Sequence, residues 1–163
     1  VMFCCDGAKM LKIKGFTLIE LMVTIGIMAI IATLAAPSFG NMLTNQKLKK
    51  TTVEMKIKLQ EARSRALLTR SPTVVCPSTI TLAACGANIT GYATLNDAQK
   101  SDSVILVDID PKVSIKSGSA TNFLFTPMGK TTEKTITLCG ENRSFTVSIF
   151  IPGTLQVEQG VAC

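Results

Sequence analysis

Residue types that could do chemistry together are concentrated in a short segment near the N-terminus. Three lysines come first: Lys9, Lys12 and Lys14. Gly15 and Phe16 follow, and Glu20 is the one charged residue between Phe16 and Phe39. A carboxylate inside a membrane span is costly in free energy and marks a functional residue by default. Glu20 is therefore the first candidate functional side chain.

The apolar segment that carries Glu20 is long enough to cross a bilayer as a helix. Residues 16–39 amount to 24 residues, which is about 36 Å of helix against a hydrocarbon core of ~30 Å. The lysines before this segment place its N-terminal side in the cytoplasm by the positive-inside rule. A plain single-span anchor, whose Glu20 snorkels to the headgroups, is the alternative interpretation.

The run Gly-Phe-Thr-Leu-Ile-Glu at residues 15–20 resembles the processing site of type IV prepilins and of type II secretion pseudopilins. The resemblance implies that a membrane aspartic peptidase, the prepilin peptidase, cleaves between Gly15 and Phe16 and methylates the new amine of Phe16. It also implies that Glu20 pairs with the Phe16 amine of a neighbouring subunit in a filament. Pro37 matches a helix-breaking or helix-loosening proline of many pilins.

The leader expected from this resemblance spans residues 1–15, with Met10 as the expected true start of the chain. Its removal lowers the formal net charge from +6 to +4 and leaves 148 residues, enough for one domain. The sequence contains no histidine, which excludes His-based acid–base catalysis, Cys-His or Ser-His dyads and His-ligated metals. It also has no phosphate-binding glycine loop and no Cys-x-x-Cys pair. We therefore expect no enzyme, no cofactor and no metal.

Residues 40–71 are expected to continue the helix with an amphipathic pattern. One face is apolar at spacings of four, three and four residues: Met55, Leu59, Ala62 and Ala66. Two acid–base pairs at i,i+4 spacing support the helix: Glu54–Lys58 and Glu61–Arg65. Pro72 cannot continue a helix and disfavours it at Ser71, so the helix is expected to end there.

The same helix carries a row of basic residues with no acid among them. Its members recur every seven residues: Lys49, Lys56, Arg63 and Arg70. A solvated helix edge is the simplest interpretation. Contact with anionic headgroups, with acids of a neighbouring subunit or with DNA phosphates are the alternatives.

After Pro72 the sequence changes to short β-branched and apolar runs separated by Gly, Asn, Asp and Pro. Strands are expected at residues 73–75, 89–95, 104–109, 113–116, 122–126, 135–139, 144–151 and 154–158. No second helical pattern is evident. The predicted fold class is α+β, with a long N-terminal helix, half membrane-spanning and half amphipathic, packed on an antiparallel β-sheet domain at residues 72–163.

Four cysteines follow the expected leader: Cys76, Cys85, Cys139 and Cys163. A domain beyond the inner membrane lies in an oxidising compartment, so disulfides are expected. Of the three possible pairings, we expect Cys76–Cys85, which closes one loop, and Cys139–Cys163, which ties the C-terminus to a strand. A four-cysteine zinc site is the alternative, although its usual paired short spacings are absent.

The C-terminal half resembles the GspH/FimT family, which includes FimU. The resemblance rests on Gly91-Tyr92, Asn96-Asp97, residues 125–129, residues 136–139 and the final strand with Cys163. It implies a minor filament subunit that helps to prime assembly. DNA-binding members present two arginines in a Gly-Arg-x-Arg turn, but the matching residues 153–156 read Gly-Thr-Leu-Gln. Arg143, Lys130 and Lys134 are the candidate substitutes.

The predicted function is that of a minor type IV pilin, processed by the prepilin peptidase and active in pilus assembly or priming. The alternatives are the type II secretion pseudopilin H and a DNA-binding minor pilin of natural transformation. Expected partners are other pilins or pseudopilins, the prepilin peptidase, the inner membrane and, in the third case, DNA. The expected location is the bacterial inner membrane, with a cytoplasmic N-terminus and a periplasmic C-terminal domain, and later the pilus filament.

Overall fold

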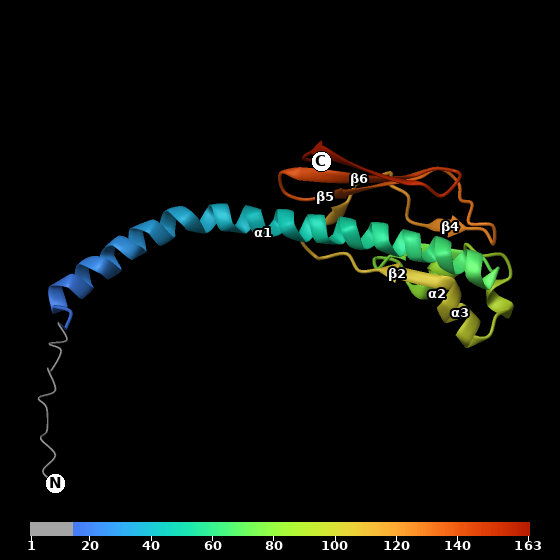
Figure 1. Ribbon diagram of the computed structural model, residues 1–163, viewed down its shortest axis with the longest axis horizontal. Coiled ribbons are helices and arrows are strands. Elements are labelled where there is room, and N and C mark those ends of the chain that lie inside the picture. Colours follow the sequence, from blue (N-terminus) through green and yellow to red (C-terminus); the bar gives the residue numbers. More distant parts are fainter. Residues whose placement is uncertain (1–14) are drawn as a thin grey trace, which may run out of the picture. The chain divides into compact units, whose positions relative to one another are not determined.

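The structure is a computed structural model that describes residues 15–163, apart from the side chains of residues 34–38. It divides into two compact units, residues 1–38 and residues 39–163. The first helix, α1 (Leu18–Thr69), contributes residues to both (Figure 1). The expected leader before Gly15, including Met10, lies outside the described residues.

The second unit is built on the buried face of α1. Met55, Leu59, Ala62 and Ala66 are all fully buried, so the predicted apolar face is confirmed. The face extends toward the N-terminus through Leu48, which is also fully buried. After Thr69 the chain turns at Arg70, which has a left-handed backbone with φ of 51°. Such a residue commonly ends a helix, and α1 therefore ends at Thr69, three residues before Pro72.

Two sheets lie in this unit. The smaller sheet has the order β2-β1-β4, from β1 (Thr73–Pro77), β2 (Val104–Val107) and β4 (Phe123–Phe125). The larger sheet has the order β3-β5-β6-β7, from β3 (Ser114–Ile115), β5 (Lys134–Cys139), β6 (Arg143–Ile149) and β7 (Leu155–Val161). The larger sheet is antiparallel throughout. In the smaller sheet β1 pairs with β4 antiparallel but with β2 parallel, so the antiparallel expectation is wrong for that pair.

The segment between β1 and β2 differs most from expectation. It forms α2 (Leu82–Gly86), the short 3₁₀ helix η1 (Tyr92–Thr94) and α3 (Asp97–Ser103). The strand predicted at 89–95 is therefore wrong, and so is the expectation of no further helix. Asn96 and Gln99 form a reciprocal capping box that starts α3. This helical connection lets β2 return parallel to β1.

The core joins α1 to both sheets. The buried helix face packs against residues of the smaller sheet, including Phe123 and Phe125, and of the larger one, including Ile136 and Val147. A second cluster lies around β1 and α2: Val74, Cys76, Cys85, Ile89 and Val104. Every residue of β1 is buried, because α1 and α2 contribute side chains to different clusters on that strand.

Candidate functional site

The described chain begins with three residues outside any helix, Gly15, Phe16 and Thr17. Thr17 is the N-cap of α1, since its Oγ1 accepts a hydrogen bond of 3.3 Å from the backbone N–H of Glu20. The spacing Thr-x-x-Glu is that of a capping box. The Gly15–Phe16 peptide bond therefore lies just before the start of α1, in backbone outside the helix.

Glu20 lies in the first turn of α1. A carboxylate there is favoured by the partial positive charge of the helix N-terminus. Glu20 forms no ion pair with any residue that the structure describes.

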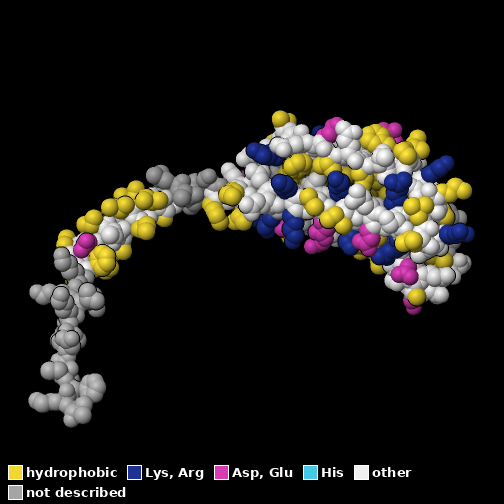
Figure 2. All heavy atoms as spheres, viewed as in Figure 1, with side chains coloured by type: hydrophobic (Ala, Val, Ile, Leu, Met, Phe, Trp, Pro, Cys, Tyr) yellow, Lys and Arg dark blue, Asp and Glu magenta, His cyan; other side chains and the backbone are white. Residues whose placement is uncertain are grey.

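The surface around Glu20 is apolar. Large hydrophobic side chains are exposed on every side of the helix between Phe16 and Ile31, with Phe16 at 79% and Leu18 at 76%. Figure 2 shows hydrophobic side chains along the visible face of this segment. A helix that is apolar all round is normally covered by other elements, by other chains or by lipid. Within the described residues, no helix meets the length and hydropathy expected of a membrane span.

The backbone of α1 is helical through residue 37. Pro37 therefore does not break the helix as expected for that position. Proline lacks the N–H for the helical bond four residues back, and the loosening expected at Pro37 stays a prediction.

The basic row of α1 does not form one continuous solvated edge. Lys49, Lys56 and Arg70 are exposed. Arg63 is half-buried, and its guanidinium donates a hydrogen bond of 3.3 Å to the backbone carbonyl of Gly153 in the β6–β7 turn. Arg63 is therefore a packing residue of that turn, and only three of the four candidates are available to an anion.

Residues 153–156 are the place where DNA-binding relatives carry their arginine turn. Gly153 has a φ of 80°, and a Cβ there would lie 2.7 Å from Nε of Arg63 and 2.9 Å from the carbonyl oxygen of Gly129. An arginine thus does lie beside this turn, but it comes from α1 and is bonded to the backbone.

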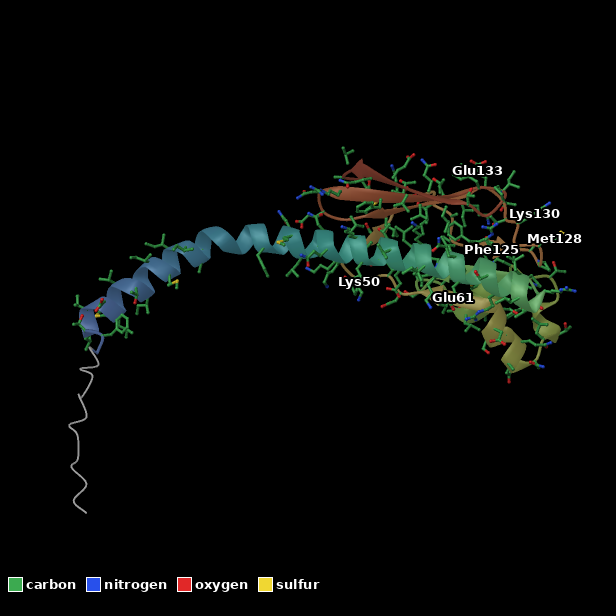
Figure 3. All side chains as sticks on the ribbon, in the orientation of Figure 1. Lys50, Glu61, Phe125, Met128, Lys130 and Glu133 are labelled. Atoms are coloured by element: carbon green, nitrogen blue, oxygen red, sulfur yellow. A yellow bond between two sulfur atoms is a disulfide. The ribbon has the colours of Figure 1, made fainter. Side chains whose placement is uncertain are left out.

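The candidate substitutes for the missing arginines are not brought together. Arg143 is the first residue of β6 and Lys134 is the first residue of β5, which pairs with the last residue of β6. The two therefore lie at opposite ends of the hairpin, on the order of 20 Å apart at ~3.4 Å per residue. Lys134 also donates hydrogen bonds to Asn122, whereas Lys130 is exposed in the loop after β4 (Figure 3). A contact between Arg143 and DNA stays a prediction, and Lys134 lies too far away to contribute to the same contact.

Two ion-pair clusters hold α1 and its neighbours. Glu61 on α1 (Figure 3) pairs with Lys58 at 2.9 Å and with Arg65 at 2.7 Å. Lys58 was expected to pair with Glu54 instead. The hydrogen bond from Lys58 lowers the pKa of Glu61 from its ordinary value, with Arg65 acting in the same direction against the effect of burial.

The second cluster ties α1 to the loop after β2. Asp110 accepts a hydrogen bond from the backbone N–H of Lys112 and pairs with Lys47 at 3.1 Å, and both lower its pKa. Sequence reasoning missed this contact, because Lys47 and Asp110 are far apart in the chain.

Both predicted disulfides are confirmed. Cys76 pairs with Cys85, with a Cα–Cα distance of 6.0 Å. Cys139 pairs with Cys163, with a Cα–Cα distance of 5.8 Å. The pairing leaves no thiolate for the four-cysteine zinc alternative, which is therefore wrong.

Two family models match different parts of the chain. Residues 54–153 match the family model described as "Type II transport protein GspH", and residues 10–36 match that of the prokaryotic N-terminal methylation motif. No curated protein matches the sequence. The crystal structure of the type IV minor pilin FimU from Pseudomonas aeruginosa is similar at 18% identity and a TM-score of 0.47, over 70% of this chain and 90% of that one. The GspH match spans more than half of the sequence and contains Met55 to Ala66 of the buried face of α1, together with β1, β5 and β6. The chain therefore belongs to the GspH family.

Proposed function

We propose that this chain is a minor pilin, a filament subunit of a type IV pilus that is processed before assembly. The observation that carries the proposal is the start of α1. There the Gly15–Phe16 bond lies outside the helix, and Thr17 caps the helix start. Glu20 is the one acid in the first turn, and the helix surface up to Ile31 is apolar on all sides. The match to the N-terminal methylation motif covers the same residues.

The proposed processing has three steps. Hydrolysis after Gly15 adds water across the peptide bond, which leaves a carboxyl group on Gly15 and frees the amine of Phe16. That amine then takes a methyl group from a sulfonium methyl donor, which leaves as a thioether while the amine loses a proton. The Glu20 carboxylate then forms an ion pair with the Phe16 amine of a neighbouring subunit and accepts a hydrogen bond from it. In an apolar surrounding each charge needs such a partner, because an unpaired charge there is strongly destabilising.

The proposed location before assembly is the inner membrane. The lysines before Gly15 favour a cytoplasmic N-terminal side. Two disulfides in the second unit support an oxidising, periplasmic environment for that part of the chain.

A processing experiment tests the proposal. A Cβ meets nothing within 4 Å at either Gly15 or Gly26, so leucine fits at both positions. Co-expression with a prepilin peptidase should yield a product that begins at a methylated Phe16, by mass spectrometry. Gly15→Leu should block cleavage and Gly26→Leu should not. Equal cleavage of both variants would contradict the proposal.

Assembly is tested separately with Glu20→Gln. This variant should be cleaved normally, because the Thr17 cap does not use the Glu20 side chain. It should be absent from sheared filaments, since its amide cannot form the ion pair. Recovery of Glu20→Gln in filaments at the wild-type level would overturn the assembly role.

A type II secretion pseudopilin is the second candidate, and the name of the matching family, type II transport protein GspH, favours it. The two machines have different outputs. Deletion of the gene should abolish surface pili if the pilus proposal holds. Loss of protein secretion with normal pili would favour the pseudopilin instead.

A further inference from the structure

The C-terminal strand β7 is a free edge of the larger sheet. It pairs with β6 along all seven of its residues, and the sheet order leaves its other side unpaired within the described residues. Residues 156–161 are all exposed, and the strand, dark red in Figure 1, lies at the outside of the sheet. An unpaired edge is a template for another strand.

The hydrogen-bond pattern determines which backbone groups face outward. Gly140 N–H donates to the carbonyl of Arg143, and Phe150 N–H donates to the carbonyl of Thr154. Because directions alternate along an antiparallel ladder, the backbone groups of Gln156, Glu158 and Gly160 point to β6. Those of Leu155, Val157 and Gln159 point away from it.

This edge has little of the protection that natural sheets normally give to an edge. Its residues, Leu-Gln-Val-Glu-Gln-Gly-Val, contain no lysine and no proline. The edge is also held firmly in place. Cys163, just after the strand, is bonded to Cys139 of β5, and Oγ of Ser144 in β6 donates to the Val161 carbonyl at 2.6 Å. A preorganised edge loses little entropy when a strand is added.

We infer that two copies of this chain pair through β7 in an antiparallel, two-fold arrangement centred on Val157. In this register the outward-facing groups of Val157 meet those of Val157 in the second copy, and Leu155 lies opposite Gln159. Leu155, Val157 and Gln159 of each copy therefore all find a backbone partner.

Side-chain charge selects this register over its neighbour. Centring the two-fold on Glu158 would place that carboxylate directly opposite itself, which is unfavourable. Centring it on Val157 places Gln156 opposite Glu158 of the second copy. Gln156 Nε2 already donates to Glu158 Oε1 at 2.8 Å within one chain, so the pair is chemically suited to the contact.

A two-fold pair of this kind is closed and cannot propagate, unlike a filament contact. Its contact area is small, so the dimer is weak and depends on protein concentration. The inference concerns the second unit and does not rest on the proposed function.

The test is sedimentation equilibrium of the full chain in density-matched detergent at several concentrations. Val157→Pro removes an N–H that points away from β6, so the β6–β7 ladder keeps its bonds, whereas Val157→Thr keeps that N–H. Gln156→Lys introduces attraction to Glu158 of the second copy, and Gln156→Glu introduces repulsion. Thermal unfolding of each variant checks that the fold is retained.

Wild type and Val157→Thr should show a reversible monomer–dimer equilibrium, and Val157→Pro should remain monomeric. Two symmetric cross-strand pairs should lower the Kd of Gln156→Lys, and raise that of Gln156→Glu, by about 2- to 30-fold. Equal association of all variants, which would indicate pairing through the apolar first unit, would overturn the inference. A monomeric wild type and Gln156→Lys would also overturn it, and would leave the edge to a strand of another protein.

Discussion

At the scale of single residues, Arg63 and Gly153 show how one long-range contact changes the meaning of a motif. Arg63 belongs by spacing to a basic row, yet its guanidinium is bonded to the Gly153 carbonyl. The turn that carries arginines in DNA-binding relatives is therefore held here by an arginine from α1. The consequence is structural stability of the turn, with no free cation at its tip.

Replacing Gly153 should destabilise the protein more than replacing a glycine with similar backbone. Gly153→Ala meets both a φ of 80° and contacts of 2.7 and 2.9 Å, whereas Gly118→Ala meets a φ of 83° in open space. The left-handed backbone alone costs alanine roughly 1–2 kcal/mol, and overlap adds roughly 1–3 kcal/mol. Chemical denaturation should give a lower free energy of unfolding for Gly153→Ala than for Gly118→Ala. Equal losses of unfolding free energy in the two variants would contradict the close contact at Gly153.

The ion pairs of Glu61 make the free energy of unfolding depend on pH in the acid range. Its folded pKa lies below the ordinary 4.5, so its pairs stabilise the protein above that pH, and this contribution is lost as the pH falls through the folded value. Partly exposed pairs contribute roughly 0.2–1 kcal/mol. Glu61→Gln should be less stable than wild type at pH 7 and equal to it below the folded pKa. Glu54→Gln is the control on the same helix, and a loss at pH 7 that persists into acid would contradict the assignment.

At the scale of elements, the two disulfides fasten different parts of the sheet system. Cys76 and Cys85 are fully buried between β1 and α2, whereas Cys163 is exposed after β7. A reductant reaches an exposed sulfur first, because exchange needs direct attack on that sulfur.

Mild reduction should therefore open Cys139–Cys163 before Cys76–Cys85. Differential alkylation followed by mass spectrometry would show the order. Amide hydrogen exchange should then rise in residues 155–161 while β1 stays protected, because β7 loses its covalent attachment and β1 is buried along its whole length. First labelling at Cys76 would contradict this order.

The long helix shows which sequence patterns are reliable. The spacing of Met55 to Ala66 predicted its buried face, because that periodicity is local. The residues of the Thr17 cap and of the Asn96–Gln99 capping box were also present in the sequence. A strand was nevertheless predicted at 89–95, from the apolar and β-branched residues before Asn96, and the cap at Asn96 was not used.

At the scale of the whole molecule, the surplus of positive charge is dispersed. Lys47 is paired with Asp110, Lys58 with Glu61 and Arg63 with the Gly153 carbonyl. Figure 2 shows Lys and Arg mixed with Asp and Glu on the visible face of the second unit. The positive net charge of the chain therefore does not indicate a continuous basic surface for DNA on this face.

Duplex DNA should accordingly bind weakly, and only at low salt. The three exposed members of the basic row, Lys49, Lys56 and Arg70, would by themselves give a slope of log K against log salt no steeper than about −3. The triple change to Gln should abolish most of this dependence in a fluorescence titration. A steeper slope, or a slope unchanged in the triple variant, would point to a different DNA surface, with Arg143 the next residue to change.

The sequence by itself determined the features that depend on neighbouring residues. These are the start and buried face of α1, most strands and the expected pairing of the cysteines; cleavage at Gly15–Phe16 stays a prediction. The tertiary structure decided what depends on residues distant in the chain. It placed Arg63 beneath the Gly153 turn, made β1 and β2 parallel, separated Arg143 from Lys134 and left β7 at an edge. Local spacing specifies which side chains share a face, whereas pairing between distant segments depends on how whole elements bury their surfaces together.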